Sequence, residues 1–170
     1  MKPLLVIFSG LPGVGKSSIA QMLSARLGAV YLRADTIENA IVEGGITQPI
    51  EGAGYVVGYR VATENLLLGN SVVADSVNPW ELTRQAWRDS AIGANAPFVD
   101  IEIICSDTVE HRRRVEDRGG NVTWDDVLRR DYHEHQSSGI LRLDSAILSV
   151  EEAVNQIEQH VLGATAHNQT

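Results

Sequence analysis

The sequence predicts an α/β fold of three layers, in which a five-stranded, mainly parallel sheet has helices on both faces. Five short apolar runs are bounded by turn residues, and most are continuous rather than alternating, which is typical of strands buried on both faces. Stretches with helical spacing of apolar residues separate these runs, and such alternation favours a parallel sheet. A chain of 170 residues fits one such domain.

The five expected strands follow the apolar runs in order. They cover residues 4–8, 29–32, 72–75, 98–105 and 140–143. The first run leads directly into a glycine-rich segment. We therefore interpret it as a buried strand rather than as the apolar part of a signal peptide.

Seven helices are expected between and after these strands. They cover residues 16–27, 36–42, 55–68, 80–92, 108–118 and 124–134, and the seventh opens at Ser149. Glycines follow the helices that end at 68, 92 and 118, as is common at helix C-termini. Ser149 and Glu152 have the spacing of a capping box, which marks a helix start.

Composition limits the setting in which the protein works. The chain has 44% hydrophobic residues and a net charge of −8, which suits a globular protein and disfavours binding to a nucleic-acid backbone. Cys105 is the single cysteine, which excludes an internal disulfide, and no apolar run is long enough to span a membrane. We expect a cytoplasmic protein with one domain at residues 1–163 and a flexible tail at 164–170.

The glycine-rich segment after the first strand carries the strongest functional signal. Residues 10–17 form a full G-x-x-x-x-G-K-[ST] motif between a strand and a helix, which is the phosphate-binding loop of nucleotide-binding proteins. Its backbone N–H groups and the helix N-terminus favour phosphate oxygens. Lys16 is expected to reach the β- and γ-phosphates of ATP, and the Ser17 hydroxyl to bind Mg²⁺. The expected ATP contacts are Gly10, Leu11, Pro12, Gly13, Val14, Gly15, Lys16, Ser17 and Ser18.

Asp75 ends the third apolar run and is a second candidate ligand for Mg²⁺. A carboxylate at the end of a buried strand lies where a metal contact is expected beside the phosphate-binding loop. An alternative interpretation is that Asp75 caps the following turn or helix. Both interpretations remain open from the sequence.

These motifs resemble those of the P-loop kinase-like ATPases, which include polynucleotide kinase, chloramphenicol phosphotransferase, adenylylsulfate kinase and zeta-toxin relatives. The resemblance covers about residues 4–160. The segments that carry it are GLPGVGKSS, YLRADTIENA, LLLGNSVVADSVNP, CSDTVEHRRRVEDR, TWDDVLRRDY and LRLDSA. It implies a P-loop NTPase fold with a small helical lid at about residues 114–135. It also implies an ATP-dependent kinase whose acceptor is a hydroxyl group.

Asp35 is the catalytic residue that the resemblance implies on the acceptor side. In the resembled kinases, an Asp at this motif position acts as general base toward the acceptor hydroxyl. The alternative is that Asp35 caps a helix that starts at Thr36. Many relatives carry Arg three residues later, where this chain has Glu38, so Arg33 is the expected substitute contact. Together with the net charge, Glu38 favours a neutral or cationic small molecule as the acceptor.

The basic segment before Gly119 resembles the lid of such kinases. Arg114 and Arg118 are four residues apart on one helix face, and the resemblance implies that they bind adenine and phosphates. Arg118 is then the expected transition-state stabiliser, which Arg129 or Arg130 would join. Asp144 belongs to a loop that resembles one framing adenine. The alternative is a solvated helix face balanced by nearby carboxylates.

Three further residues are expected near the acceptor: Arg60, Asn78 and Arg84. For Arg84 the alternative is a salt bridge with Glu81 or Asp89.

Two other polar residue types carry no functional expectation. His111, His133 and His135 raise the question of a zinc site. The last two are two apart on an expected helix and therefore face different directions, and no cysteine or third ligand is suitably placed, which disfavours zinc. Cys105 is expected to be a small buried residue.

The favoured function is transfer of the γ-phosphoryl group of ATP to a hydroxyl of a small molecule such as an antibiotic, sugar or nucleoside. The alternatives are a regulatory ATPase that acts with a protein partner, a nucleic-acid 5′-end kinase and a toxin-type kinase of sugar nucleotides. The guanine-reading motif N-K-x-D is absent from the sequence, which disfavours GTP. The expected partners are ATP and the acceptor, without nucleic acid or membrane, and the chain is expected as a monomer or homodimer.

Overall fold

The computed structural model describes the chain except residues 1, 47–49, 51, 120–121, 137–138 and 168–170. Within the described residues, five strands form one entirely parallel sheet in the order β2-β3-β1-β4-β5. The strands are β1 (Leu5–Ser9), β2 (Val30–Arg33), β3 (Val72–Asp75), β4 (Phe98–Ile104) and β5 (Leu141–Asp144). The predicted fold class is confirmed, and the sheet has no antiparallel pair among these strands.

Seven helices connect and follow these strands in the described residues. They are α1 (Lys16–Leu27), α2 (Ala34–Glu43), α3 (Ala53–Leu67), α4 (Glu81–Gly93), α5 (Thr108–Asp117), α6 (Trp124–Arg129) and α7 (Val150–His167). Ser149 and Glu152 form the predicted capping box, because the Glu152 carboxylate accepts from the Ser149 N–H and the Ser149 hydroxyl accepts from the Glu152 N–H. Helix α7 extends into the segment where we expected a flexible tail.

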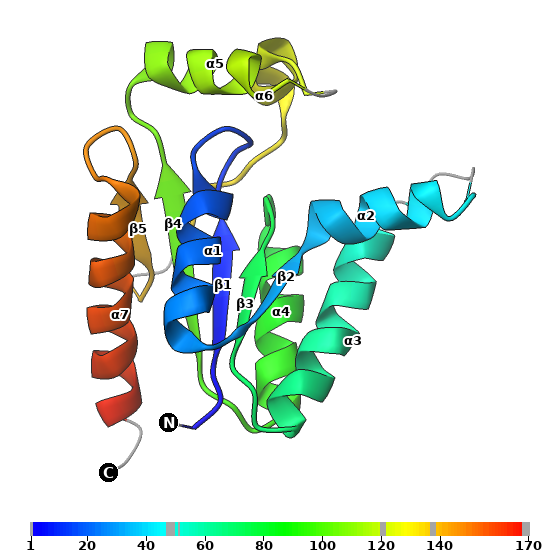
Figure 1. Ribbon diagram of the computed structural model, residues 1–170, viewed down its shortest axis with the longest axis vertical. Helices are drawn as coiled ribbons and strands as arrows, with labels where there is room; N and C mark the ends of the chain where they lie inside the picture. The colour runs from blue at the N-terminus through cyan, green and yellow to red at the C-terminus, as the bar shows by residue number, and fades with distance from the viewer. Residues whose placement is uncertain (1, 47–49, 51, 120–121, 137–138, 168–170) are drawn as a thin grey trace.

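Two hydrophobic clusters lie on opposite faces of the sheet. Alternate residues of β1 point to opposite sides, so Val6 and Phe8 join one cluster and Leu5 and Ile7 the other. Helices α1 and α7 cover the first face, and α3 and α4 cover the second (Figure 1). This is the three-layer arrangement that continuous apolar strands predict.

The register of the central strands brings functional residues to one edge of the sheet. Asp75 pairs with Phe8 on one side and with Arg33 on the other. The segment after β1 therefore emerges beside the ends of β2 and β3. Ligands of open parallel sheets bind at this carboxyl edge.

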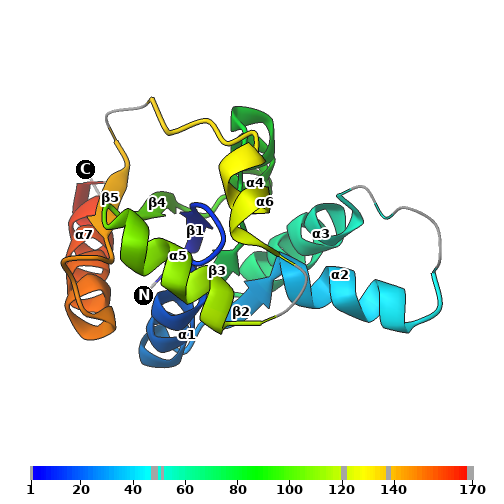
Figure 2. The same cartoon turned by 90° about the horizontal axis from the view of Figure 1, so that it is seen from above.

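Helices α5 and α6 lie beyond this edge rather than on either face of the sheet (Figures 1 and 2). Thr123 starts α6 through a capping box with Asp126. The helix ends at Arg129, five residues earlier than predicted, because Arg130 adopts an extended conformation with ψ of 125°. His133 and His135 consequently lie in the segment between α6 and β5, and their expected place on a helix is wrong.

The segment after α6 covers a polar part of the second face of the sheet. Glu102 on β4 is fully buried there, and it accepts hydrogen bonds from Tyr132 Oη at 2.6 Å and Arg142 Nε at 2.7 Å. A buried carboxylate needs such partners. The hydrogen bonds of Glu102 therefore help to fix the path of residues 130–136 across the sheet.

Cys105 follows the end of β4 and is partly exposed. The thiol is less buried than expected, although it still packs against the first hydrophobic cluster. Among the described residues, no helix combines the length and the apolar character that crossing a membrane requires.

Candidate nucleotide and acceptor site

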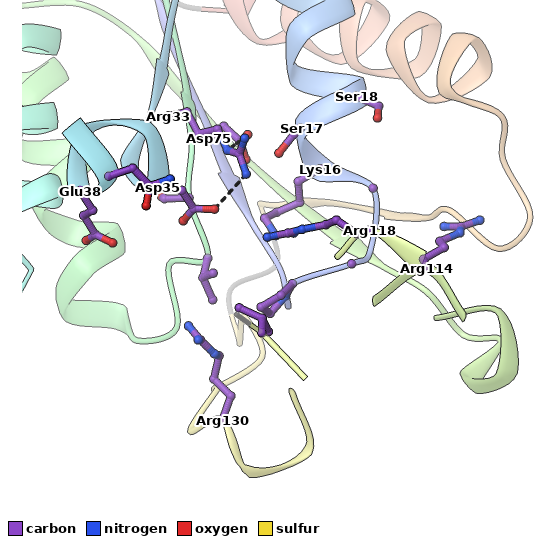
Figure 3. A pocket seen from close by; sticks show the side chains of 17 residues that line it. Lys16, Ser17, Ser18, Arg33, Asp35, Glu38, Asp75, Arg114, Arg118 and Arg130 are labelled. Atoms are coloured by element: carbon purple, nitrogen blue, oxygen red, sulfur yellow. Dashed lines mark hydrogen bonds and ion pairs between the residues drawn. The ribbon is translucent and has the colours of Figure 1, made fainter. Parts of the chain in front are cut away.

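A cavity of about 790 Å³ opens at the carboxyl edge of the sheet, between the segment after β1, the start of α2 and the two helices beyond the edge (Figure 3). Residues from six parts of the chain line it. They are Pro12, Gly13, Gly15, Lys16, Ser17, Ser18, Arg33, Asp35, Glu38, Asn39, Asp75, Ser76, Val77, Arg114, Arg118, Val122 and Arg130. Of the expected ATP contacts, Gly10, Leu11 and Val14 lie in the loop but not among these lining residues.

The phosphate-binding loop, residues 10–17, needs its glycines for two reasons. Gly10, Gly13 and Gly15 have φ values of 138°, 84° and 90°, which side chains rarely adopt. A Cβ atom at Gly13 would also lie 2.4 Å from Val115 Cγ2 on α5. The loop is therefore shaped for close approach both to a ligand and to the first helix beyond the sheet edge.

Lys16 is buried at the start of α1, and its ammonium donates a hydrogen bond of 2.8 Å to the Leu11 carbonyl. Burial lowers the pKa of Lys16 to about 8, although the nearby carboxylates of Asp75 and Asp35 oppose this shift. The charges of Arg118 and Arg130 lower the pKa further. Lys16 is thus within electrostatic range of two carboxylates and two guanidinium groups.

Asp75 and Ser17 offer oxygen ligands where the phosphate-binding loop meets β3. The Asp75 carboxylate is buried, accepts a hydrogen bond of 2.7 Å from Tyr31 Oη, and lies 3.8 Å from Arg33 Nε. Burial and the hydrogen bond to Asp75 raise the pKa of the Tyr31 phenol, so Tyr31 stays a donor.

A hydroxyl and a carboxylate oxygen suit the hard Mg²⁺ ion, so the residues present fit this metal. Within the described residues, no group of three or more His, Cys, Asp or Glu side chains could hold a metal by itself. A magnesium ion here would therefore depend on ligand oxygens from a bound phosphate as well as on Ser17 and Asp75.

Asp35 lies in the first turn of α2, facing the cavity from the side opposite to α1 (Figure 3). Its carboxylate accepts a hydrogen bond of 3.0 Å from Arg33 Nη2 and is about half exposed. The alternative that Asp35 caps a helix is wrong, because α2 begins at Ala34 and its N-cap residue is Arg33. The carboxylate is therefore free of a capping role and accessible from the cavity.

Three arginines approach the cavity from α5, its C-cap and the end of α6. Arg114 is anchored, since it donates to Ser145 Oγ at 2.9 Å, to the Ser145 carbonyl at 3.1 Å and to Glu110 Oε1 at 2.8 Å. Arg118 and Arg130 line the cavity. The alternative of a solvated, charge-balanced face describes their neighbours and holds in part for Arg114. Arg112 pairs with Glu116, Arg113 pairs with Glu110 and Asp117, and Arg114 also pairs with Glu110.

The structure does not bring Arg60, Asn78, Arg84 or Asp144 to the lining of this cavity. Arg84 is almost fully buried and donates to the carbonyl oxygens of Asn78 and His133. Its expected alternative, a salt bridge with Glu81 or Asp89, is wrong, and the ion pair of Glu81 is formed with Arg88 instead.

Asn78 and Asp144 have clear structural roles instead. Asn78 is buried with a φ of 47° and donates from Nδ2 to the Phe8 carbonyl at 2.8 Å. Asp144 accepts from the N–H groups of Ser106 and Ala146. Arg60 lies on the exposed side of α3.

His111 is a residue of the site that sequence reasoning missed. Its imidazole is buried, lies 2.8 Å from the carbonyl oxygen of Pro12, and packs edge-on against Trp124 with ring centroids 5.0 Å apart. The contact joins residues 99 positions apart. The sequence around His111 reads only as a polar helix, so no local signal indicates it.

The fold and the cavity together define a nucleotide-binding protein with a phosphate-binding loop and a second, carboxylate-bearing side. The AAA domain family matches residues 5–157 of the chain. The chain therefore belongs to this family. No curated protein sequence matches it.

Solved structures share the fold over nearly the whole chain. A kinase candidate from Chloroflexus aurantiacus has a TM-score of 0.78 and 21% identity, covering 96% of this chain and 99% of its own. The Mycobacterium tuberculosis APS kinase CysC, in complex with AMPPNP and APS, has a TM-score of 0.72 and 20% identity, with coverage of 94% and 98%. A Sinorhizobium meliloti gluconokinase has a TM-score of 0.69 and 18% identity, with coverage of 98% and 96%. The chain thus has the fold of P-loop kinases.

Proposed function

We propose that the protein is a Mg²⁺- and ATP-dependent kinase that transfers the γ-phosphoryl group to a hydroxyl of a small molecule. The observation that carries this proposal is the division of one cavity into two sides. The phosphate-binding loop with Lys16 and Ser17 forms one side, and Asp35 on α2 forms the other. A switch ATPase needs the first side but has no need of a carboxylate facing it.

The first side is suited to the triphosphate of ATP. Loop N–H groups and the N-terminus of α1 attract phosphate oxygens. The Lys16 ammonium, which donates to the Leu11 carbonyl in this structure, can donate to those phosphate oxygens instead. Arg114, Arg118 and Arg130 surround the same volume, and such groups stabilise charge that spreads over the transferring phosphoryl group. Mg²⁺ bound by Ser17 and Asp75 would supply further charge neutralisation.

The second side is suited to orienting and deprotonating an alcohol. Arg33 bridges Asp35 and Asp75, at 3.0 Å and 3.8 Å, and so fixes the position of the Asp35 carboxylate relative to the metal ligands. Asp35 would accept the proton of the acceptor hydroxyl while the oxygen of that hydroxyl forms its bond to the γ-phosphorus. In phosphoryl transfer such a residue acts mainly by positioning the nucleophile in line.

Cellular setting and assembly follow from the same proposal. A cytoplasmic location supplies ATP and keeps the thiol of Cys105 reduced. We propose a monomer or homodimer as the working form.

ADP release, measured with and without a panel of small hydroxyl compounds, tests the proposal. The wild type is compared with Asp35→Asn and with a control, Asp89→Asn, whose exposed carboxylate on α4 accepts a hydrogen bond from Gln85. We expect one compound to raise ADP release many-fold in the wild type and the control but not in Asp35→Asn, which still binds ATP. If no compound raises ADP release and Asp35→Asn keeps the basal rate, a regulatory ATPase with a protein partner becomes the better account.

A further inference from the structure

Glu38 is a carboxylate in the cavity that the proposed phosphoryl transfer does not use. It lies on α2 one turn after Asp35, is partly buried, and is directed toward the cavity (Figure 3). Among the described residues it makes no hydrogen bond and no ion pair. Buried carboxylates usually have such a partner. The Glu38 carboxylate therefore has no protein partner among the described residues, although it lines a cavity that a ligand can enter.

The packing of α3 leaves room for this carboxylate. A Cβ atom at Gly54 would lie 2.4 Å from Glu38 Cγ and 2.9 Å from its Oε1. Only glycine at position 54 therefore accommodates the Glu38 side chain as it stands. The Glu38 side chain therefore packs closely against α3 at Gly54.

The electrostatics around Glu38 favour a cation. Burial and the charge of Asp35 raise the pKa of the Glu38 carboxyl group, and the charge of Arg130 opposes this shift. The other guanidinium on this side, that of Arg33, is already engaged by Asp35 and Asp75. A positive charge from the ligand would relieve the repulsion between the two carboxylates of α2.

Arg130 is the one cavity cation whose charge acts on Glu38 within the described residues. It also acts on Lys16, whose pKa it lowers, so it lies within range of both sides. In the proposed reaction we expect Arg130 to turn to the phosphates, because negative charge is greatest there. Glu38 then has no protein cation to neutralise it.

We propose that Glu38 binds a protonated amine of the acceptor, so that the acceptor class is an amino alcohol. This inference rests on the proposed function, since it assigns the part of the acceptor that does not react. Residues three apart on a helix have Cβ atoms about 5–6 Å apart. Asp35 would then hold the hydroxyl and Glu38 the ammonium group, at a separation that one sugar or cyclitol ring spans.

An anionic acceptor does not fit this side of the cavity. A phosphate or carboxylate at the same place would meet Glu38 and Asp35, while Arg33 is already paired. Like charges at such distances repel, and more strongly where water is excluded. The acceptor side is therefore selective for charge as well as for a hydroxyl group.

The test uses hydroxyl compounds in matched triples, each with an amine, its N-acetyl derivative and a carboxylate analogue on one ring. Glucosamine, N-acetylglucosamine and glucuronate form the first triple, and aminocyclitols and amino-nucleosides the next. ADP release and the phosphorylated product are measured for the wild type, for Glu38→Gln and for Glu43→Gln. Glu43 is an exposed carboxylate at the end of α2, outside the cavity lining, so Glu43→Gln is a control for charge on the same helix.

We expect the wild type and Glu43→Gln to phosphorylate an amine and not its N-acetyl or carboxylate analogue. Glu38→Gln should raise KM for the amine by roughly 10- to 100-fold, as loss of a charge-assisted hydrogen bond predicts, with kcat changed little. Glu38→Arg should reduce turnover of the amine and favour the carboxylate analogue.

Two other outcomes separate the inference from the proposed function. If the wild type prefers a neutral or anionic acceptor, or if Glu38→Gln leaves KM unchanged, the inference is wrong while the kinase function stands. If no triple yields a phosphorylated product although ATP binds, both are rejected.

Discussion

The Nε2 atom of His111 lies 2.8 Å from the carbonyl oxygen of Pro12. A carbonyl oxygen can only accept, so Nε2 carries the hydrogen and donates it. Val115, one turn later on α5, would be 2.4 Å from a Cβ atom at Gly13. Helix α5 therefore packs directly against the phosphate-binding loop.

Loss of the His111 donor should weaken nucleotide binding. His111→Ala leaves the buried Pro12 carbonyl without its partner and removes the contact with Trp124, which should cost about 1–3 kcal/mol of stability. We expect ATP affinity to fall by roughly tenfold. Isothermal titration with ATP and thermal unfolding measure the two effects.

His111→Gln is the matched variant, since its amide can still donate to the carbonyl. It should retain more ATP affinity than His111→Ala. Equal ATP affinity in the wild type and His111→Ala would mean that the contact does not shape the loop.

A methyl group at Gly13 should damage the site more than one at Gly28. Both residues have positive φ, 84° and 60°, so alanine is strained at either, by about 1–2 kcal/mol. Only at Gly13 does the added Cβ also overlap a side chain, that of Val115, whereas nothing lies within 4 Å at Gly28. ATP affinity should fall in Gly13→Ala, stay near that of the wild type in Gly28→Ala, and recover in part in Gly13→Ala/Val115→Ala. Failure of the double variant to recover any affinity would argue against the overlap as the cause.

A buried histidine should make the stability of the fold depend on pH. Ser9 Oγ donates its single hydrogen to the Ile101 carbonyl, so His135 Nε2, 2.8 Å away, must donate to Ser9. Nδ1 of His135 is then unprotonated, and it is buried without a partner among the described residues. Burial and the charge of Arg84 lower the pKa of His135 below its ordinary value of 6.5.

The sign of the effect follows from this lowered pKa. Between the folded-state pKa and 6.5, the unfolded chain binds a proton that the folded chain does not, so the free energy of unfolding falls as the pH falls through this range. His135→Gln, which lacks the titrating group, should lose less stability between pH 7 and pH 5. Urea unfolding at several pH values measures this, and parallel profiles for the two proteins would contradict it. Below pH 4.5 both should lose stability again, because hydrogen bonds from Tyr132 and Arg142 outweigh burial and lower the pKa of Glu102.

Local patterns were enough to predict much of the fold and the position of the glycine-rich loop at the cavity. The motif at residues 10–17, together with the strand before it and the helix after it, identifies the loop that the structure places in the cavity. Continuous apolar strands predict a sheet covered on both faces, and the two core clusters confirm this. The positions of Lys16, Ser17, Asp35 and Asp75 in one cavity follow from parallel strands that end at the same edge.

Contacts between distant segments account for what the sequence did not predict. Arg84 looks like a surface residue of an amphipathic helix, yet residues 130–136 fold over it and its guanidinium binds main-chain carbonyls. The contact of His111 with Pro12 and the packing of Glu38 against Gly54 likewise depend on helices that meet only in three dimensions. Helix α6 ends early because Arg130 has an extended conformation. No glycine or proline near Arg130 marks this helix end in the sequence.

The most direct test of the central claim follows the γ-phosphoryl group itself. The protein is incubated with Mg²⁺, ATP labelled at the γ-phosphate and the acceptor that most stimulates ADP release, and the label is followed by ³¹P NMR or chromatography. The account predicts one phosphate monoester of the acceptor for each ADP formed, at a rate that Asp35→Asn lowers by roughly 100-fold or more while ATP affinity is kept. Label recovered only as inorganic phosphate, at a rate that neither the acceptor nor Asp35→Asn changes, would contradict it.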